Sequence, residues 1–199
     1  MRTVLAILFN NFETLDVFGP VEILGRLKDH FQIEFVSPQG GIVTSTQNVP
    51  VLTGKISDAH VSHCTLLVPG GTGVVELVRN EEFIACLKAL AHDAEYVLTV
   101  CTGSILFSKT GLLNGKKATS NKRLFSWTAS ESPEVIWMKK ARWIKDGSVY
   151  TSSGVSAGMD MTLAFVADVL GYDIAKQQSI EIEYDWKEDA AWDPFSDIY

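Results

Sequence analysis

The sequence predicts an α/β domain in which a mostly parallel sheet is covered by helices on both faces. Strand-like and helix-like runs alternate from one end of the chain to the other, and this order is typical of parallel strands joined by crossover helices. Several strand-like runs are short and uniformly apolar, as expected for strands buried on both faces. Binding sites in such sheets lie beyond the carboxyl ends of the strands, so functional residues are expected in the loops there.

The first third of the chain begins this alternation. Thr3–Phe9 is an apolar run and is predicted to be the first strand. Leu15–Leu27 has apolar residues at helical spacing, and Phe31–Ser37 alternates apolar and polar residues as a strand does. A short hairpin is predicted within Ile42–Val51. Cys64–Val68 is continuously apolar, which predicts a strand buried on both faces.

The middle of the chain repeats the pattern. The glycine-rich loop Pro69–Gly73 leads into helical segments, of which Glu81–His92 is the clearer. Tyr96–Val100 is a second buried apolar run and predicts another strand. Gly103–Thr110 follows it at once and is predicted to be a helix. Strand and helix are therefore separated here by only two residues, Cys101 and Thr102.

The last third of the chain predicts a hairpin, two helices and a tail. The hairpin has Asp146-Gly147 at its turn, between the strand-like runs Arg142–Lys145 and Val149–Thr151. Gly158–Leu170 is amphipathic and predicts a helix, and Ile174–Tyr184 predicts the last one. The remaining residues, 185–199, are acidic and aromatic. Their aromatic side chains predict that this tail packs on the rest of the molecule.

Composition and charge limit the classes of function. The 199 residues carry a formal net charge of -7 with scattered basic side chains, which argues against a nucleic-acid partner. The short basic run Lys139–Arg142 is expected to be a solvated strand edge. The apolar run near Met1 is too short for a signal peptide and has no cleavage site, and no stretch approaches the roughly 20 residues of a membrane span. We expect one cytoplasmic domain over residues 1–199 with no membrane partner.

Three cysteines are present, Cys64, Cys86 and Cys101. Their odd number and unpaired spacing argue against a disulfide framework or a structural zinc site. Cys101 alone stands between a buried strand and a glycine at a helix start, which is typical of a nucleophile elbow. The helix amides and dipole predict a lowered pKa for its thiol. A buried core cysteine is the alternative, and it is the interpretation for Cys64 and Cys86.

Two further loops at the same sheet edge suit a cysteine nucleophile. Pro69–Gly73 exposes backbone amides, which are predicted to form half of an oxyanion hole, with the amide of Thr102 as the other half; a plain glycine-rich turn is the alternative. Asp16 stands in an otherwise apolar helix start. It is predicted to exchange a proton with a substrate attached to the cysteine, although it would also favour the helix dipole. Glu22 is a second candidate, further along the helix.

These segments together resemble the ThiJ/PfpI superfamily, and the closest likeness is to its isocyanide hydratase branch. The segments that carry the resemblance are Leu15–Pro20, Pro69–Gly73, Val100–Ser104, Gly111–Gly115 and Ser153–Asp160. The resemblance implies a three-layer, flavodoxin-like or glutamine amidotransferase-like sandwich and a homodimer with the site near its interface. It also implies that Cys101 is the nucleophile and Asp16 its neighbouring carboxylate. Gly71 and Thr102 match the anion-stabilising positions.

Two positions depart from the patterns of the superfamily. Thr102 follows the cysteine where protease-like members have a histidine, and a threonine cannot act as the general base of a Cys-His pair. Asn121 stands where hydratase-like members carry a histidine. None of the four histidines, His30, His60, His63 and His92, matches a catalytic position of the family. The first departure disfavours a peptidase, and the second weakens the transfer of substrate identity.

The resemblance implies a cysteine-dependent hydratase acting on a small electrophile, with no cofactor and no metal. In the isocyanide version, the Cys101 thiolate attacks the terminal carbon and forms a covalent thioimidate. Asp16 supplies and recovers protons, and water releases an N-substituted formamide. Three alternatives stay open: hydrolysis of an amide or peptide, a glyoxalase-like reaction of small dicarbonyls, and a redox or ligand sensor that uses the cysteine without catalysis.

Overall fold

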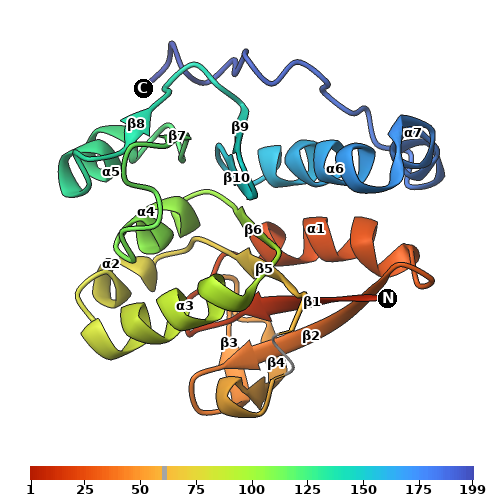
Figure 1. Cartoon of the computed structure of the whole chain (residues 1–199). Coiled ribbons are helices and arrows are strands. Elements are labelled where there is room, and N and C mark those ends of the chain that lie inside the picture. The colour runs from red at the N-terminus through yellow and green to blue at the C-terminus, as the bar shows by residue number, and fades with distance from the viewer. Residues whose placement is uncertain (60–61) are drawn as a thin grey trace.

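The computed structural model describes residues 1–59 and 62–199, and in these residues an eight-stranded sheet runs through the molecule (Figure 1). The strand order is β3-β4-β2-β1-β5-β6-β10-β9. The strands are β1 (Arg2–Ile7), β2 (Phe31–Ser37), β3 (Gly41–Thr44), β4 (Pro50–Lys55), β5 (Thr65–Val68), β6 (Tyr96–Thr99), β9 (Trp143–Asp146) and β10 (Val149–Ser152). All neighbours pair in parallel except the edge strands β3 and β9, which are antiparallel to β4 and β10.

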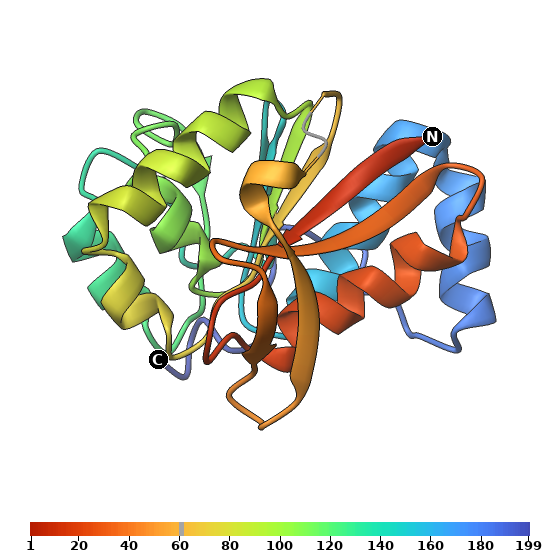
Figure 2. The same ribbon diagram turned by 90° about the horizontal axis from the view of Figure 1, so that it is seen from below.

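Helices cover both faces of this sheet, as Figure 2 shows. On one face lie α1 (Thr14–Arg26), α6 (Ala157–Leu170) and α7 (Tyr172–Glu181), and on the other α2 (Val74–Leu77), α3 (Glu81–Asp93), α4 (Gly103–Ser108) and α5 (Phe125–Glu131). A 3-10 turn, η1 (Ile56–Asp58), follows β4. The predicted three-layer α/β fold is therefore confirmed. None of the helices in the described part of the chain combines the length and the apolar character needed to cross a bilayer.

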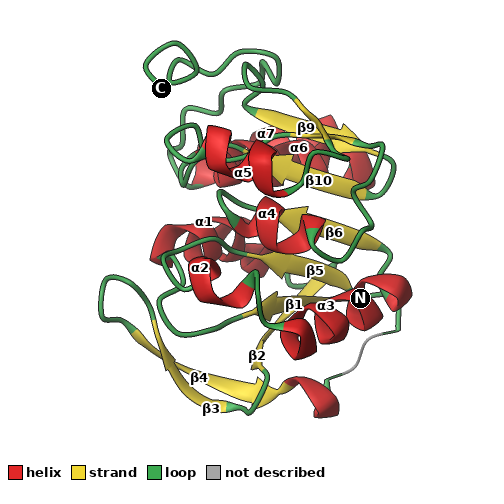
Figure 3. Ribbon diagram, turned by 90° about the vertical axis from the view of Figure 1, so that its left-hand side faces the viewer, coloured by secondary structure: helices red, strands yellow, loops and turns green. Residues whose placement is uncertain are grey.

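The central strands are buried from both sides, which explains their apolar sequences. All four residues of β5 are buried, as are the last four of β1. A strand with helices on each face has no exposed side, so alternation of polar and apolar residues is lost. The two strands are also parallel neighbours, and β6 pairs with β5 in the same direction. Their carboxyl ends therefore reach the same edge of the sheet (Figure 3).

Three loops meet at that edge, those after β1, β5 and β6. The amide of Glu13 donates to the carbonyl of Gly70, at 2.9 Å, and the amide of Gly73 donates to Asn11, at 3.1 Å. These bonds join the first loop to the second. The third loop contains Cys101. The fold thus brings together the three loops in which sequence reasoning placed the chemistry, because parallel strands deliver their loops to one side.

Some elements differ from the sequence-based expectation. The hairpin predicted within Ile42–Val51 extends through β4, because β4 also pairs in parallel with β2 and so joins the main sheet. Two short strands, β7 (Lys117–Ala118) and β8 (Ile136–Trp137), and the helix α5 between them were not predicted. Two-residue strands carry too little periodicity for a pattern to identify them.

The C-terminal half contains one further correction. Arg142 was expected on a solvated edge, yet it is 6% exposed and forms an ion pair of 2.6 Å with Asp160 of α6. The tail, residues 185–199, runs from α7 back across the top of the molecule toward α5 in Figure 1. Trp186 and Asp193 of the tail are buried, whereas Trp192, Phe195 and Tyr199 are exposed. Of the four aromatic side chains expected to pack, only that of Trp186 is buried.

Candidate active site

Cys101 lies in the tight turn between β6 and α4. Its φ is 57°, in the left-handed region that residues with side chains rarely adopt. Its amide donates to the carbonyl of Ser153, at 3.0 Å. A Cβ atom at Gly103 would stand 2.2 Å from the carbonyl oxygen of Val68, so only glycine allows α4 to start this close to β5. The structure therefore has, at Cys101, the sharp strand-to-helix turn that the sequence predicted, and this turn is called the elbow below.

The elbow opens into a cavity of about 390 Å³, called here the Cys101 cavity. Val75, Leu124, Trp127 and Val155 contribute apolar wall, while Glu13, Asn121 and Arg123 contribute polar groups. Cys101 itself is only 6% exposed. A cavity of this size with mostly apolar walls is suited to a small molecule rather than a folded polypeptide.

Asp16, in the first turn of α1, is completely buried beside this turn. Its Oδ2 accepts a hydrogen bond of 2.8 Å from the amide of Gly70, and its Oδ1 has no hydrogen-bond partner among the described residues. Burial raises the pKa of the carboxyl to about 8, against the opposing effects of the Gly70 amide and the Cys101 side chain. The raised pKa therefore favours the protonated form of the Asp16 carboxyl at neutral pH.

The Cys101 thiol does not have the lowered pKa that its helix-start position predicted. Burial, and after it the charge of Asp16, raise the pKa of the thiol to about 12. The amides of Thr102 and Val155 and the side chain of Asn121 act in the opposite direction. The expectation was wrong because α4 has only six residues and its amides do not offset removal of the sulfur from water. The raised pKa favours the thiol form of the resting cysteine.

The two amides predicted to stabilise an anion have different surroundings. The amide of Thr102 is directed at the sulfur of Cys101. The amide of Gly71 donates to Oγ1 of Thr102, at 3.2 Å, so it has a partner before any ligand binds. The amide of Val155 also interacts with the sulfur, and sequence reasoning missed this donor. Its role could not be inferred because Val155 is far from the cysteine in sequence.

The side chain of Asn121 is in direct contact with the sulfur. Its Nδ2 donates to Cys101 Sγ, at 3.2 Å, and its Oδ1 accepts from the amide of Leu124, at 3.3 Å. The second bond fixes which end of the amide faces the thiol. The sequence identified Asn121 only as a departure from a family pattern. Its contact with the cysteine depends on how the segment after α4 folds back over the elbow.

Other candidate residues lie away from the Cys101 cavity. Glu22 is exposed on α1 and forms an ion pair with Arg26, at 3.4 Å. His30, His63 and His92 line no part of the cavity, and His60 lies outside the described residues. The structure thus brings Cys101 together with Asp16, Thr102 and Gly71, and it leaves Glu22 apart. Cys64 is buried next to β5, and Cys86 is half-buried in α3.

Comparisons with known proteins give one consistent result. The sequence matches the DJ-1/PfpI family over residues 2–168. Isonitrile hydratase of Pseudomonas putida is 32% identical over 181 residues, which cover 89% of this chain and 76% of that protein. Deglycase TK1284 of Thermococcus kodakarensis is 30% identical over 123 residues, covering 59% of this chain and 70% of that protein. The crystal structure of a ThiJ/PfpI family protein from Pseudomonas syringae superposes with a TM-score of 0.84 and 26% identity, covering 92% of this chain and 75% of that one.

Proposed function

The chain belongs to the DJ-1/PfpI family, and on that premise we propose that it is a cysteine-dependent hydratase that adds water to a small isonitrile. One observation carries the proposal. A buried carboxyl with a pKa of about 8 stands beside a cysteine at a nucleophile elbow. Such a pair holds, at neutral pH, both the nucleophile and the proton that the terminal carbon of an isonitrile takes up when the sulfur adds to it. The similarity to isonitrile hydratase supports the same reaction.

The proposed reaction begins with transfer of the Asp16 proton to the terminal carbon of the isonitrile. The sulfur of Cys101 forms a bond to that carbon, and the thiol proton passes to the Asp16 carboxylate. The product of this step is a covalent thioimidate, R–N=CH–S–Cys. No net proton is gained or lost, because Asp16 gives one proton and receives another.

Water completes the cycle by attacking the thioimidate carbon. One proton of this water passes to the nitrogen, and the other passes to the sulfur as the carbon–sulfur bond breaks, which restores the Cys101 thiol. The released product is the N-substituted formamide, R–NH–CHO. The amides of Thr102 and Val155 and the Asn121 side chain are directed at the sulfur, and donors in those positions stabilise negative charge on it as the bond breaks.

Hydrolysis of amides or peptides receives less support. Such a mechanism needs a base that deprotonates the thiol and an acid for the leaving amine, roles usually taken by histidine. The histidines at 30, 63 and 92 do not line the Cys101 cavity. The side chain that contacts the sulfur is Asn121, which does not titrate. The cysteine and Asp16 therefore fit proton exchange with a small substrate better than acyl transfer.

The proposal is tested by incubating the protein with benzyl isonitrile, whose ring suits the apolar walls of the cavity. We expect N-benzylformamide from the wild type and from Cys86→Ala, which serves as the matched control because Cys86 lies outside the cavity. Cys101→Ala is expected to release none. Mass spectrometry of quenched wild-type reactions is expected to find the thioimidate adduct on the peptide containing Cys101.

Equal turnover by the wild type and Cys101→Ala would remove the mechanism. Parallel assays with a model p-nitroanilide and with methylglyoxal distinguish the competing reactions. Release of nitroaniline or of lactate, without any formamide from the isonitrile, would assign the site to amide hydrolysis or to a glyoxalase-like reaction instead.

A further inference from the structure

The segment after β7 contacts Cys101 through two consecutive residues. The hydroxyl of Ser120 donates to the carbonyl oxygen of Cys101, at 3.1 Å, and Asn121 Nδ2 donates to its sulfur, at 3.2 Å. Both bonds depend on the position of one short stretch of backbone. The residue that follows, Lys122, is buried and hydrogen-bonded.

Lys122 is a buried lysine, with 3% of its surface exposed. Its Nζ donates to Thr119 Oγ1, at 2.7 Å, to the carbonyl of Ala141, at 2.7 Å, and to the carbonyl of Ser120, at 3.3 Å. All three acceptors are neutral. A buried ammonium is costly even when it is hydrogen-bonded, so a lysine here is not explained by packing alone. Its bonds join the segment 119–122 to the loop before β9.

The tail supplies an opposite charge that acts on Lys122. Asp193 is 1% exposed, and its charge opposes the effect of burial, which lowers the pKa of Lys122 to about 8. Asp193 Oδ1 accepts from the amide of Phe195, at 2.9 Å, and Oδ2 has no hydrogen-bond partner among the described residues. The tail therefore brings a carboxylate with a free oxygen to the side of the molecule that holds Lys122.

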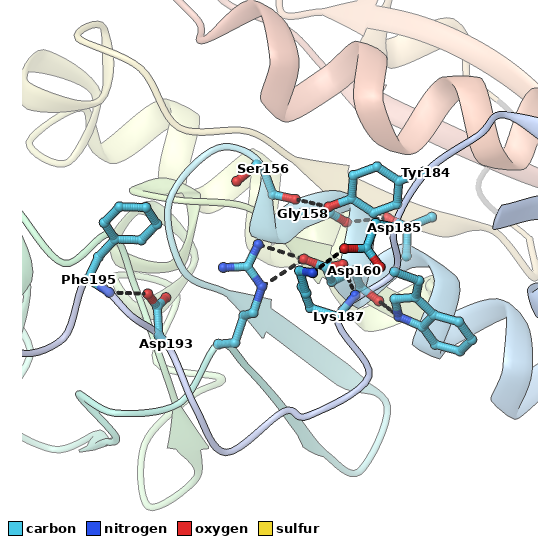
Figure 4. A network of polar contacts seen from close by, with 11 residues as sticks. Ser156, Gly158, Asp160, Tyr184, Asp185, Lys187, Asp193 and Phe195 are labelled. Carbon is cyan, nitrogen blue, oxygen red and sulfur yellow. Dashed lines mark hydrogen bonds and ion pairs between the residues drawn. The ribbon is translucent and has the colours of Figure 1, made fainter.

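The tail is itself fastened to α6 and to the loop before β9. The amide of Lys187 donates to Asp160 Oδ1, at 2.8 Å, and the indole of Trp186 donates to the Asp160 carbonyl, at 3.2 Å. The amide of Arg142 donates to the carbonyl of Ala190, at 2.8 Å. Figure 4 shows Asp160 with Lys187, and Asp193 beside Phe195. This segment lies beyond the family match, which ends at residue 168.

We propose that Lys122 is a positioning residue of the cysteine site: its buried ammonium, with Asp193 of the tail as its charge partner, holds Asn121 Nδ2 against Cys101 Sγ. The inference rests on the cysteine site of the proposed function, but not on the identity of the substrate. The proposal gives the tail a role in the chemistry of Cys101, although Asp193 lies about 90 residues from Cys101 in sequence.

The proposal is tested by the rate at which iodoacetamide modifies Cys101 at pH 7, below the pKa of Lys122, followed by mass spectrometry of the Cys101 peptide. Asn121 lowers the pKa of the thiol, so Asn121→Ala is expected to slow modification about three- to tenfold, the effect of one lost hydrogen bond to a developing charge. Lys122→Met is expected to slow it by a similar factor. A site that was only loosened would instead expose the sulfur and be modified faster.

A double-mutant cycle identifies the route of the effect. If Lys122 acts through Asn121, the double variant Lys122→Met with Asn121→Ala reacts no more slowly than Asn121→Ala alone. Multiplied effects of the two substitutions, or unchanged or faster modification in Lys122→Met, would overturn the proposal. Lys109→Met is the matched control, because Lys109 also donates to a backbone carbonyl, that of Glu131, at 2.7 Å, yet does not adjoin Asn121. Its modification rate is expected to equal that of the wild type.

Asp193→Asn provides a second test that does not depend on the folding of Lys122→Met. It is expected to slow modification about twofold in the wild-type background and not at all in Asn121→Ala. A twofold effect that persists without Asn121 would contradict the proposed route. The outcome is separable from that of the proposed function, because modification by iodoacetamide reads the thiol whether or not the protein hydrates benzyl isonitrile.

Discussion

The amide of Gly70 donates a 2.8 Å hydrogen bond to Oδ2 of Asp16 and so fixes a fully buried carboxyl of α1 against the loop after β5. One amide donor does not offset the cost of burying the negative charge. Burial therefore raises the pKa of the Asp16 carboxyl to about 8. The same contact holds the acid where the Cys101 side chain interacts with it. The raised pKa thus favours a protonated carboxyl beside Cys101, as the proposed reaction requires.

The first prediction concerns Asp16→Asn and the pH dependence of stability. Between pH 4 and 8 the unfolded wild type has lost the Asp16 proton while the native state keeps it, so the wild type loses stability as the pH rises through this range. Asparagine has no such titration. We expect the free energy of unfolding of the variant to exceed that of the wild type by on the order of 2–4 kcal/mol at pH 7. The variant is expected to lose the proposed hydration of benzyl isonitrile.

Urea unfolding at pH 4, 5.5 and 7 measures this difference. The gap between Asp16→Asn and the wild type should widen with each step of pH. A gap that stays constant over the three pH values would contradict the raised pKa, because it would show that the carboxyl titrates alike in the folded and unfolded chains.

The second prediction concerns backbone strain at Cys101. A residue with a side chain at a φ of 57° is strained, whereas glycine is not. We expect Cys101→Gly to be about 1 kcal/mol more stable than Cys101→Ala, measured as the free energy of unfolding. Ala89→Gly, at an exposed position of α3, is the control, because glycine in an ordinary helix is destabilising. Its free energy of unfolding should fall by about 0.5–1 kcal/mol. Equal stability of the two Cys101 variants would argue against strain in the elbow.

The third prediction concerns the close approach of α4 to β5. In Gly103→Ala the new Cβ meets the backbone oxygen of Val68 at 2.2 Å, so the elbow must move. We expect a loss of roughly 2–4 kcal/mol of stability and a large fall in the rate of the proposed hydration of benzyl isonitrile. At Gly25, in α1, the nearest atom to a new Cβ is Ile33 Cγ1, at 3.7 Å. Gly25→Ala is expected to gain about 0.5–1 kcal/mol; a similar loss in both variants would contradict the steric argument.

The fourth prediction concerns the buried ion pair below the tail. Asp160→Asn leaves the Arg142 guanidinium buried without its charge partner, which is expected to cost about 3–5 kcal/mol. The weakened anchor should also speed cleavage by trypsin after Lys187. Glu22→Gln breaks the exposed pair with Arg26 and should cost less than about 1 kcal/mol. Unfolding and limited proteolysis measure both effects, and equal costs for the two variants would show that burial adds nothing to the pair.

Features that depend on consecutive residues were the ones that could be predicted. The buried runs of β5 and β6 identify themselves by composition, and the elbow follows from a strand, a cysteine and a glycine in succession. The strands β7 and β8 were missed because a two-residue strand has no periodicity. Asn121 was noticed only as an unusual residue at its position, since nothing local connects it with a sulfur 20 residues earlier.

The sequence by itself determined the α/β architecture, the elbow at Cys101 and the loops that surround it, because each is encoded by neighbouring residues. Tertiary structure alone decided the electrostatics of the site. Burial by distant segments raises the pKa of both Cys101 and Asp16, and it turns Arg142 from an expected surface charge into half of a buried pair. Desolvation depends on everything packed around a group, and a linear sequence does not state what those neighbours are.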